Sequence, residues 1–172
     1  MTIPTTTPWP ALPDPAPCGD AALRARVQAA LNGKTKPLGA LGRLEALALQ
    51  LACAQGHERP RLHAPQLVVF AADHGIASQG VSAYPAEVTR QMVLNFLAGG
   101  AAVSVLARQH GIALTVADCG VAAEFDAHPQ LRRLKVEGAE RGSADSSRGP
   151  AMSTAQCAAA IAHGRRLVAA LP

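Results

Sequence analysis

The clearest pattern in the chain is an apolar run, Leu67–Ala72, that stops at the polar turn Asp73-His74-Gly75. A short run of β-branched and aromatic residues between a proline and a glycine predicts a strand buried on both faces. A helical stretch follows, and then a second strand, Leu114–Ala117, stops at the similar turn Asp118-Cys119-Gly120. Strand, helix and strand with matching ends indicate a parallel βαβ unit, so we expect both turns to face one crevice.

Apolar residues at helical spacing predict five helices. The helices cover Asp20–Leu31, a segment from about Ala40, a segment that starts after Pro85, Ala101–Gln109, and a segment from the capping box at Ser153 to about Ala170. In the helix that follows Gly99-Gly100 we expect Ala102, Val105 and Leu106 to face inward. Residues 123–150 show no periodicity, which predicts a long loop with a short strand at Arg133–Val136.

This order of elements predicts an α/β fold in which helices flank a parallel sheet. Residues 1–17 hold six prolines and predict an extended or disordered arm. We expect residues 18–60 to form a helical accessory segment and residues 61–172 to form the α/β part. The pattern stops after a helix, where a strand should follow, so we expect an incomplete sheet whose C-terminal strands and helices are missing.

A glycine-rich basic stretch, Gly33–Leu44, leads into the second helix. Such a loop at a helix N-terminus is able to bind a phosphate, although it lacks the P-loop pattern. The alternative is a helix–loop–helix corner with surface lysines. From about Ala40 the pattern turns helical, and its apolar stripe consists of Leu41, Leu44, Leu47, Ala48 and Leu51.

Composition limits the classes of partner. Apolar residues make up 49% of the chain and aromatic residues only 3%, and the net charge is +4. Aromatic side chains interleaved with basic ones are absent, so we do not expect nucleic-acid binding. The four cysteines are far apart, which fits a reducing cytosol, and no apolar run approaches the length of a membrane span. We therefore expect a cytoplasmic protein with no membrane partner.

The titratable residues that the βαβ unit brings together are Asp73, His74 and Asp118. A carboxylate beside an imidazole is able to perform general acid–base catalysis, as in a hydrolase. Aspartates at strand ends also commonly accept hydrogen bonds from the following turn. His57, His63 and His74 have no metal-ligand spacing, so no metal site is expected. The residues alone thus indicate a small-ligand site at the strand ends.

Beyond these patterns, the chain resembles the nicotinate-nucleotide–dimethylbenzimidazole phosphoribosyltransferase family from about residue 20 to its end. The motifs that carry the resemblance are Lys34-Thr35-Lys36-Pro37 with the Leu38–Glu45 stretch, Phe70–Ile76, Gly80–Thr89, Gln91–Ala102, Asp118–Val121 and Pro150-Ala151-Met152. The resemblance implies a Rossmann-like α/β domain with a smaller accessory domain, working as a homodimer without metal or cofactor. It also implies phosphoribosyl transfer from nicotinate mononucleotide to 5,6-dimethylbenzimidazole, giving α-ribazole 5′-phosphate for the lower ligand of cobalamin.

By the same resemblance, the aromatic base binds near the Asp-His-Gly turn and the segment after it. The substrate-binding residues implied on this sequence are Asp73, His74, Gly75, Ser82, Tyr84, Gln91 and Met92. A flat heteroaromatic ring needs an apolar or aromatic wall and a few hydrogen-bonding groups, which these side chains are able to supply.

One departure from the family concerns catalysis. The family's catalytic glutamate and its glycine-rich nucleotide-binding stretch lie beyond residue 172, so no catalytic residue is assigned. We expect the chain to be the N-terminal half of the enzyme and inactive alone. The alternative is a non-catalytic benzimidazole-binding or subunit-interaction module derived from the enzyme.

Overall fold

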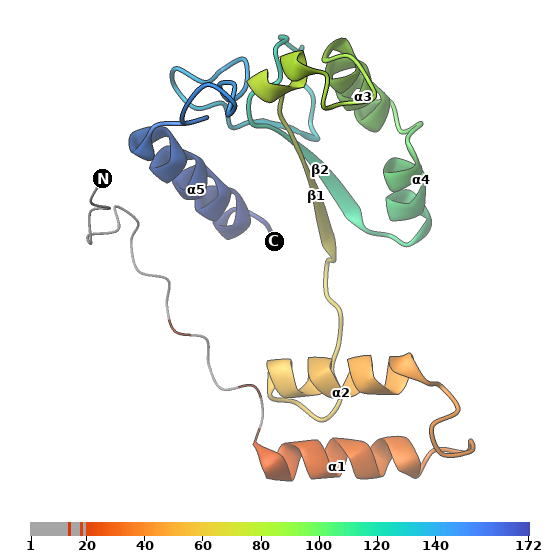
Figure 1. The fold of residues 1–172 in the computed structure, drawn as a ribbon. Coiled ribbons are helices and arrows are strands. Elements are labelled where there is room, and N and C mark those ends of the chain that lie inside the picture. The colour runs from red at the N-terminus through yellow and green to blue at the C-terminus, as the bar shows by residue number, and fades with distance from the viewer. Residues whose placement is uncertain (1–13, 15–17, 19) are drawn as a thin grey trace. The chain divides into compact units, whose positions relative to one another are not determined.

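The computed structural model describes residues 14, 18 and 20–172, so most of the predicted N-terminal arm lies outside the described residues (Figure 1). The described residues form two compact units that divide between His63 and Ala64. The predicted boundary between an accessory segment and an α/β domain, at residues 60 and 61, stays a prediction.

The first unit is a pair of helices, α1 (Ala21–Asn32) and α2 (Arg43–Gln55). The Asp20 carboxylate caps α1 by accepting from the amide of Leu23, which satisfies one of the unpaired N–H groups of the first turn. The core of this two-helix unit consists of Leu23, Val27, Leu31 and Ala52.

The predicted apolar stripe forms the packed face only in part: Ala48 packs against the core and Leu51 is half-buried. Leu41, Leu44 and Leu47 are exposed, whereas Ala52 and Cys53 are buried. Because α2 is rich in both Leu and Ala, two of its faces are apolar and periodicity cannot tell which one is packed. The packed face holds Ala52, with Ala48 and Leu49 beside it.

The second unit contains a three-stranded parallel sheet in the order β1-β2-β3. The strands are β1 (Gln66–Ala71), β2 (Ala113–Asp118) and β3 (Leu131–Arg133). Between β1 and β2 the chain forms the short 3-10 helix η1 (Gly75–Gln79) and the helices α3 (Glu87–Leu97) and α4 (Ala102–Gln109). The predicted βαβ unit, and with it a helix-flanked parallel α/β fold, is confirmed.

Helix α5 (Thr154–Ala169) ends the chain, and Figure 1 shows α5 on one side of β1 and α3 with α4 on the other. The predicted capping box is confirmed: the Ser153 hydroxyl accepts from the amide of Gln156, and the Gln156 side chain accepts from the amide of Ser153. The core of this unit lies between α3 and the sheet, and its buried members are Ala71, Val93, Val116, Val121, Phe125 and Leu131.

Three details of the prediction are wrong. Strand β1 is an edge strand rather than a strand buried on both faces, and the Phe70 residue is 57% exposed. Helix α4 turns Ser104 and Ala107 inward, while Val105 and Leu106 are exposed. The third strand, β3, lies two residues earlier than predicted, because it pairs with β2 from Val116 to Asp118.

One span of the described residues, Glu87–Gln109, is long and apolar enough for a membrane helix by composition, with a mean hydropathy of 1.3 over its window. The expectation that no such run exists was therefore too simple. The structure divides the span into α3 and α4 with a turn at Gly99-Gly100. Neither helix reaches the roughly 20 residues that cross a bilayer.

Candidate functional site

The ends of β1 and β2 meet as the matching turns predict. The amide of Cys119 donates to the carbonyl of Ala71 at 2.8 Å, and the amide of Asp73 donates to the carbonyl of Gly120 at 3.1 Å. The two turns are thus joined by backbone hydrogen bonds at the carboxyl edge of the sheet, where ligands bind in parallel α/β folds.

Both aspartates use their carboxylates to hold backbone amides. Asp118, which is 1% exposed, accepts from the amides of Gly120 at 3.1 Å and Val121 at 2.8 Å. Asp73 accepts from the amide of Ala122 at 2.8 Å, across the two turns. These bonds match the turn-stabilising interpretation and not an acid–base pair, because no hydrogen bond or ion pair joins either carboxylate to His74 in the described residues.

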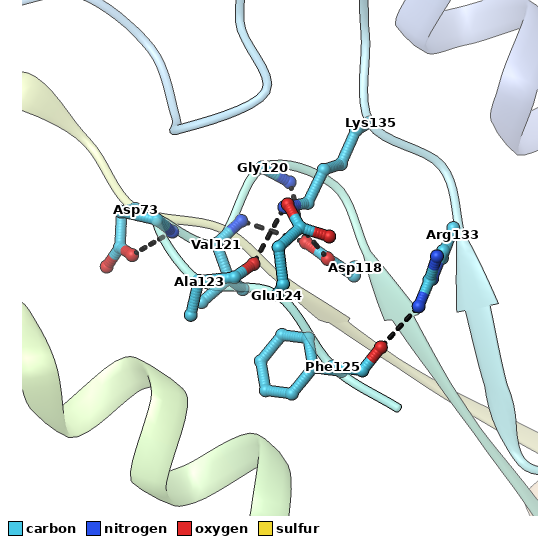
Figure 2. A network of polar contacts seen from close by, with 10 residues as sticks. Asp73, Asp118, Gly120, Val121, Ala123, Glu124, Phe125, Arg133 and Lys135 are labelled. Atoms are coloured by element: carbon cyan, nitrogen blue, oxygen red, sulfur yellow. Dashed lines mark hydrogen bonds and ion pairs between the residues drawn. The ribbon is translucent and has the colours of Figure 1, made fainter. Parts of the chain in front are cut away.

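Lys135 completes this network (Figure 2). Its ammonium group donates to the carbonyl of Ala123 at 2.8 Å and lies 3.1 Å from the Glu124 carboxylate and 3.5 Å from that of Asp118. The sequence places Lys135 next to a strand. It does not reveal that Lys135 pairs with Asp118, 17 residues earlier at the end of β2.

The side chain of His74 is oriented by the loop before α5. Its Nδ1 atom lies 2.9 Å from the Ser143 hydroxyl, and the amide of Gly75 donates to the Ser143 carbonyl at 2.8 Å. Gly75 allows this approach, because a Cβ atom there would lie 2.6 Å from the amide nitrogen of Asp145. Gly75 therefore supports the site by packing.

A cavity of about 520 Å³, called the larger cavity here, opens at the end of β1 toward η1 and α3. Five of the predicted substrate-binding residues line it: Asp73, His74, Ser82, Tyr84 and Met92. The remaining walls are mainly apolar and include Val69, Phe70, Ile76, Val88 and Phe96. Gly75 and Gln91 are not among the lining residues, and Gln91 is exposed on α3.

The rim of the larger cavity is formed by a tight turn. The Ser82 hydroxyl donates to the carbonyl of Tyr84 at 2.9 Å, and the amide of Tyr84 donates back to the Ser82 oxygen at 3.2 Å. Tyr84 is 71% exposed, although its ring is apolar over most of its surface. Ser82 thus sets the backbone that presents an exposed aromatic side chain at the cavity.

A second cavity of about 220 Å³, called the smaller cavity here, lies between the end of β1 and α5. Phe70, Ala72 and His74 line both cavities. The smaller cavity also includes Cys119, whose thiol has a raised pKa because burial and the neighbouring Asp118 charge disfavour the thiolate. Sequence reasoning did not predict this cavity, since its walls come from five separate segments.

The basic stretch before α2 forms a corner. The Lys36 ammonium group lies 2.8 Å from the Glu45 carboxylate, which also accepts from the amide of Leu41 at 3.1 Å. These contacts lower the pKa of Glu45, chiefly through the Lys36 hydrogen bond. Because Lys36 is paired within the corner, the arrangement favours the helix–loop–helix interpretation over a phosphate cradle.

Comparison with known proteins identifies the family. A family model described as "Phosphoribosyltransferase" matches residues 16–172. The nicotinate-nucleotide–dimethylbenzimidazole phosphoribosyltransferase of Variovorax paradoxus is 62% identical over 153 residues, covering 89% of this chain and 43% of its own length. The enzyme of the same name from Cupriavidus taiwanensis is 58% identical over 145 residues, 84% of this chain and 41% of its own.

A solved structure has the same fold. The crystal structure of CobT from Thermus thermophilus matches with a TM-score of 0.78 and 45% identity, over 86% of this chain and 45% of that chain. This chain thus spans less than half the length of the relatives it matches. It belongs to the nicotinate-nucleotide–dimethylbenzimidazole phosphoribosyltransferase family and corresponds to the N-terminal part of that family's chain.

Proposed function

We propose that this chain provides the base-binding part of an enzyme that transfers phosphoribose from nicotinate mononucleotide to 5,6-dimethylbenzimidazole, giving α-ribazole 5′-phosphate for cobalamin. The larger cavity carries the proposal. It lies at the carboxyl end of a parallel strand, and its 520 Å³ falls within the range of about 300–1,000 Å³ typical of small-molecule sites.

The lining of the larger cavity suits a fused two-ring base. Val88, Met92 and Phe96 present apolar surface from α3, and Tyr84 adds an aromatic ring at the rim. Asp73 bonds the Ala122 amide through Oδ2, which leaves its Oδ1 atom for a ring N–H. In this proposal Asp73 and His74 supply the polar contacts, and the apolar walls hold the methyl-bearing ring.

The proposed reaction exchanges two bonds at one carbon. A nitrogen of dimethylbenzimidazole attacks C1′ of the ribose as the bond from C1′ to the nicotinate nitrogen breaks. The bonding pair stays on the departing nicotinate, and the benzimidazole N–H proton is released. We assign no catalytic residue among the described residues, whose part is to bind and orient the ring. As part of the same proposal, the enzyme acts in the cytoplasm as a homodimer.

The first experiment measures binding of dimethylbenzimidazole to this chain by isothermal titration. Tyr84→Ala should weaken binding about three- to tenfold, since an aromatic contact contributes roughly 0.5–1.5 kcal/mol beyond its buried area. Leu94→Ala is the matched control, because Leu94 is an exposed apolar residue of α3 outside the larger cavity. No saturable binding, or equal effects of both variants, would exclude the larger cavity as the base site.

A second experiment separates the enzyme from a binding module. The chain is mixed with nicotinate mononucleotide and dimethylbenzimidazole, and α-ribazole 5′-phosphate is sought by chromatography beside a full-length relative. Binding with product shows that these residues suffice for transfer. Binding without product, next to an active control, favours the alternative of a benzimidazole-binding module.

A further inference from the structure

The helical unit carries a surplus of positive charge. Residues 20–63 contain seven lysines and arginines but only three aspartates and glutamates. Each of these three carboxylates already has a partner: Asp20 caps α1, Glu45 pairs with Lys36, and Glu58 pairs with Arg26. The remaining cations of this segment therefore have no carboxylate of the segment left to neutralise them.

Two of those cations lie in the loop that follows α2, residues 56–63, which is called the basic loop here. Arg59 and Arg61 are both exposed. Their side chains form no hydrogen bond or ion pair with any of the described residues. A guanidinium group presents a planar fork of N–H donors that matches phosphate and carboxylate oxygens. The basic loop thus offers two such forks to a ligand.

Both arginines line the same cavity, of about 360 Å³, which is called the loop cavity here. Its lining residues are Gln55, His57, Arg59, Arg61 and His63. Three of them are alternate positions along the chain, and the residues between them, Pro60 and Leu62, do not line the cavity. The basic loop therefore gathers its basic side chains around one hollow, and no carboxylate of the described residues lines it.

Hydrogen bonds hold the basic loop in one shape. The side-chain amide of Gln55 donates to the carbonyl of Arg61 at 2.8 Å and accepts from the amide of the same residue at 3.0 Å. The amides of Gly56 and His57 donate to carbonyl groups in the last turn of α2, so the negative end of this helix is capped. The loop cavity is thus formed before any ligand binds, which lowers the entropic cost of binding.

His57 is oriented by the same loop. The amide of Arg59 donates to its Nδ1 atom at 3.1 Å. In the tautomer that accepts this bond, the Nε2 atom carries the proton and is able to donate to an anion. An imidazole donor therefore joins the two guanidinium groups at the loop cavity.

From these observations we infer that the loop cavity binds the diphosphate group of a small molecule. Two guanidinium groups suit a ligand with more than one negative charge, whereas a single carboxylate would leave one of them unpaired. The volume falls within the range of about 300–1,000 Å³ typical of small-molecule sites. Residues 20–63 contain no Phe, Trp or Tyr, so the loop cavity has no aromatic side chain on which the bases of a nucleic acid would stack.

This inference does not depend on the proposed function. All five lining residues belong to the helical unit, and none of them lines the larger cavity, where dimethylbenzimidazole is proposed to bind. The diphosphate group is free in pyrophosphate and part of a larger molecule in a nucleoside diphosphate, and the two sources are separated by the experiment.

The test measures pyrophosphate binding to this chain by isothermal titration at a fixed ionic strength of about 0.15 M, because salt screens exposed charges. Pyrophosphate should bind at one saturable site and more tightly than inorganic phosphate. Arg61→Gln should weaken this binding at least about tenfold, since it removes charge-assisted hydrogen bonds. Arg43→Gln is the matched control, because Arg43 is an exposed arginine of the same unit outside the loop cavity. Circular dichroism checks that both variants keep their fold.

Three results would overturn the inference: no saturable binding of pyrophosphate, inorganic phosphate binding as tightly as pyrophosphate, or equal losses in Arg61→Gln and Arg43→Gln. The last result would show an effect of net charge alone. ADP binding with the same affinity as pyrophosphate supports recognition of the diphosphate group by itself, and tighter ADP binding supports a nucleotide as the ligand. Dimethylbenzimidazole binding should be unchanged in Arg61→Gln; a loss there would contradict a separate site.

Discussion

At the scale of single residues, the strand-end aspartates serve the fold before they serve any ligand. Asp118 is fully buried and holds two backbone amides, and Asp73 holds a third across the neighbouring turn. A buried carboxylate without such partners would be strongly unfavourable. Lys135 provides the opposite charge, so the stability of this edge of the sheet depends on a residue outside both matching turns.

Replacing Lys135 tests this dependence. Lys135→Met removes the cation near Asp118 and leaves the Ala123 carbonyl without its donor, so it should destabilise the fold by about 1–3 kcal/mol. Glu124→Gln is the control: the Glu124 side chain is 83% exposed, and an exposed ion pair contributes at most about 1 kcal/mol. Urea unfolding measures both variants. Equal small effects would show that the buried contact adds nothing to the exposed one.

At the scale of elements, the sequence predicts what depends on neighbours along the chain. Each strand end, and likewise the Ser153 capping box, depends on residues a few positions apart along the chain. The ends of β1 and β2 and the capping box are confirmed. Which face of a helix is buried depends on partners far away. Ser104 is buried in α4 because its hydroxyl donates to the carbonyl of Phe96 at 2.9 Å, and no apolar pattern reveals that bond.

The candidate site divides in the same way. Tyr84 and Met92 follow the Asp-His-Gly turn closely enough for a motif to place them, and both line the larger cavity. The smaller cavity includes His163 of α5 and Leu134 after β3, which approach β1 only through the tertiary fold. The family resemblance therefore indicated the residues of one cavity, whereas the second cavity depends on the packing of the long loop and α5.

That long loop packs against the turn after β1 at a glycine. Gly142 has φ +104°, and a Cβ atom there would lie 2.2 Å from the Asp73 carbonyl oxygen. Gly142→Ala should therefore destabilise the fold by at least about 2 kcal/mol, since it combines backbone strain with a backbone clash. Gly149→Ala should change stability by less than about 1 kcal/mol, because nothing lies near that position. Thermal unfolding of both variants measures the difference; matching melting temperatures would contradict the packing seen here.

At the scale of the whole molecule, stability should decline in acid, because carboxylates in both units have pKa values below their usual range. In the helical unit, the Lys36 hydrogen bond lowers the pKa of Glu45. In the α/β unit, hydrogen bonds from the Ser147 hydroxyl and amide lower the pKa of Asp145, and the Gln79 side chain adds to this. A carboxyl group with a lowered folded pKa stabilises the protein above its unfolded pKa, and this stabilisation disappears as pH falls through the folded value.

Asp145 offers the clearest test, because it joins the long loop to η1. Its carboxylate accepts from the Ser147 hydroxyl at 2.7 Å and from the Gln79 amide group at 2.7 Å. Asp145→Asn removes the ionised form, so the variant should be less stable at pH 7 and lose less stability between pH 6 and about 3, where free aspartate titrates near 3.9. Asp126→Asn, at an exposed aspartate, should keep the slope of the unmodified chain. Urea midpoints measured across this pH range decide the matter: an unchanged slope in Asp145→Asn would mean that protonating Asp145 does not contribute to acid unfolding.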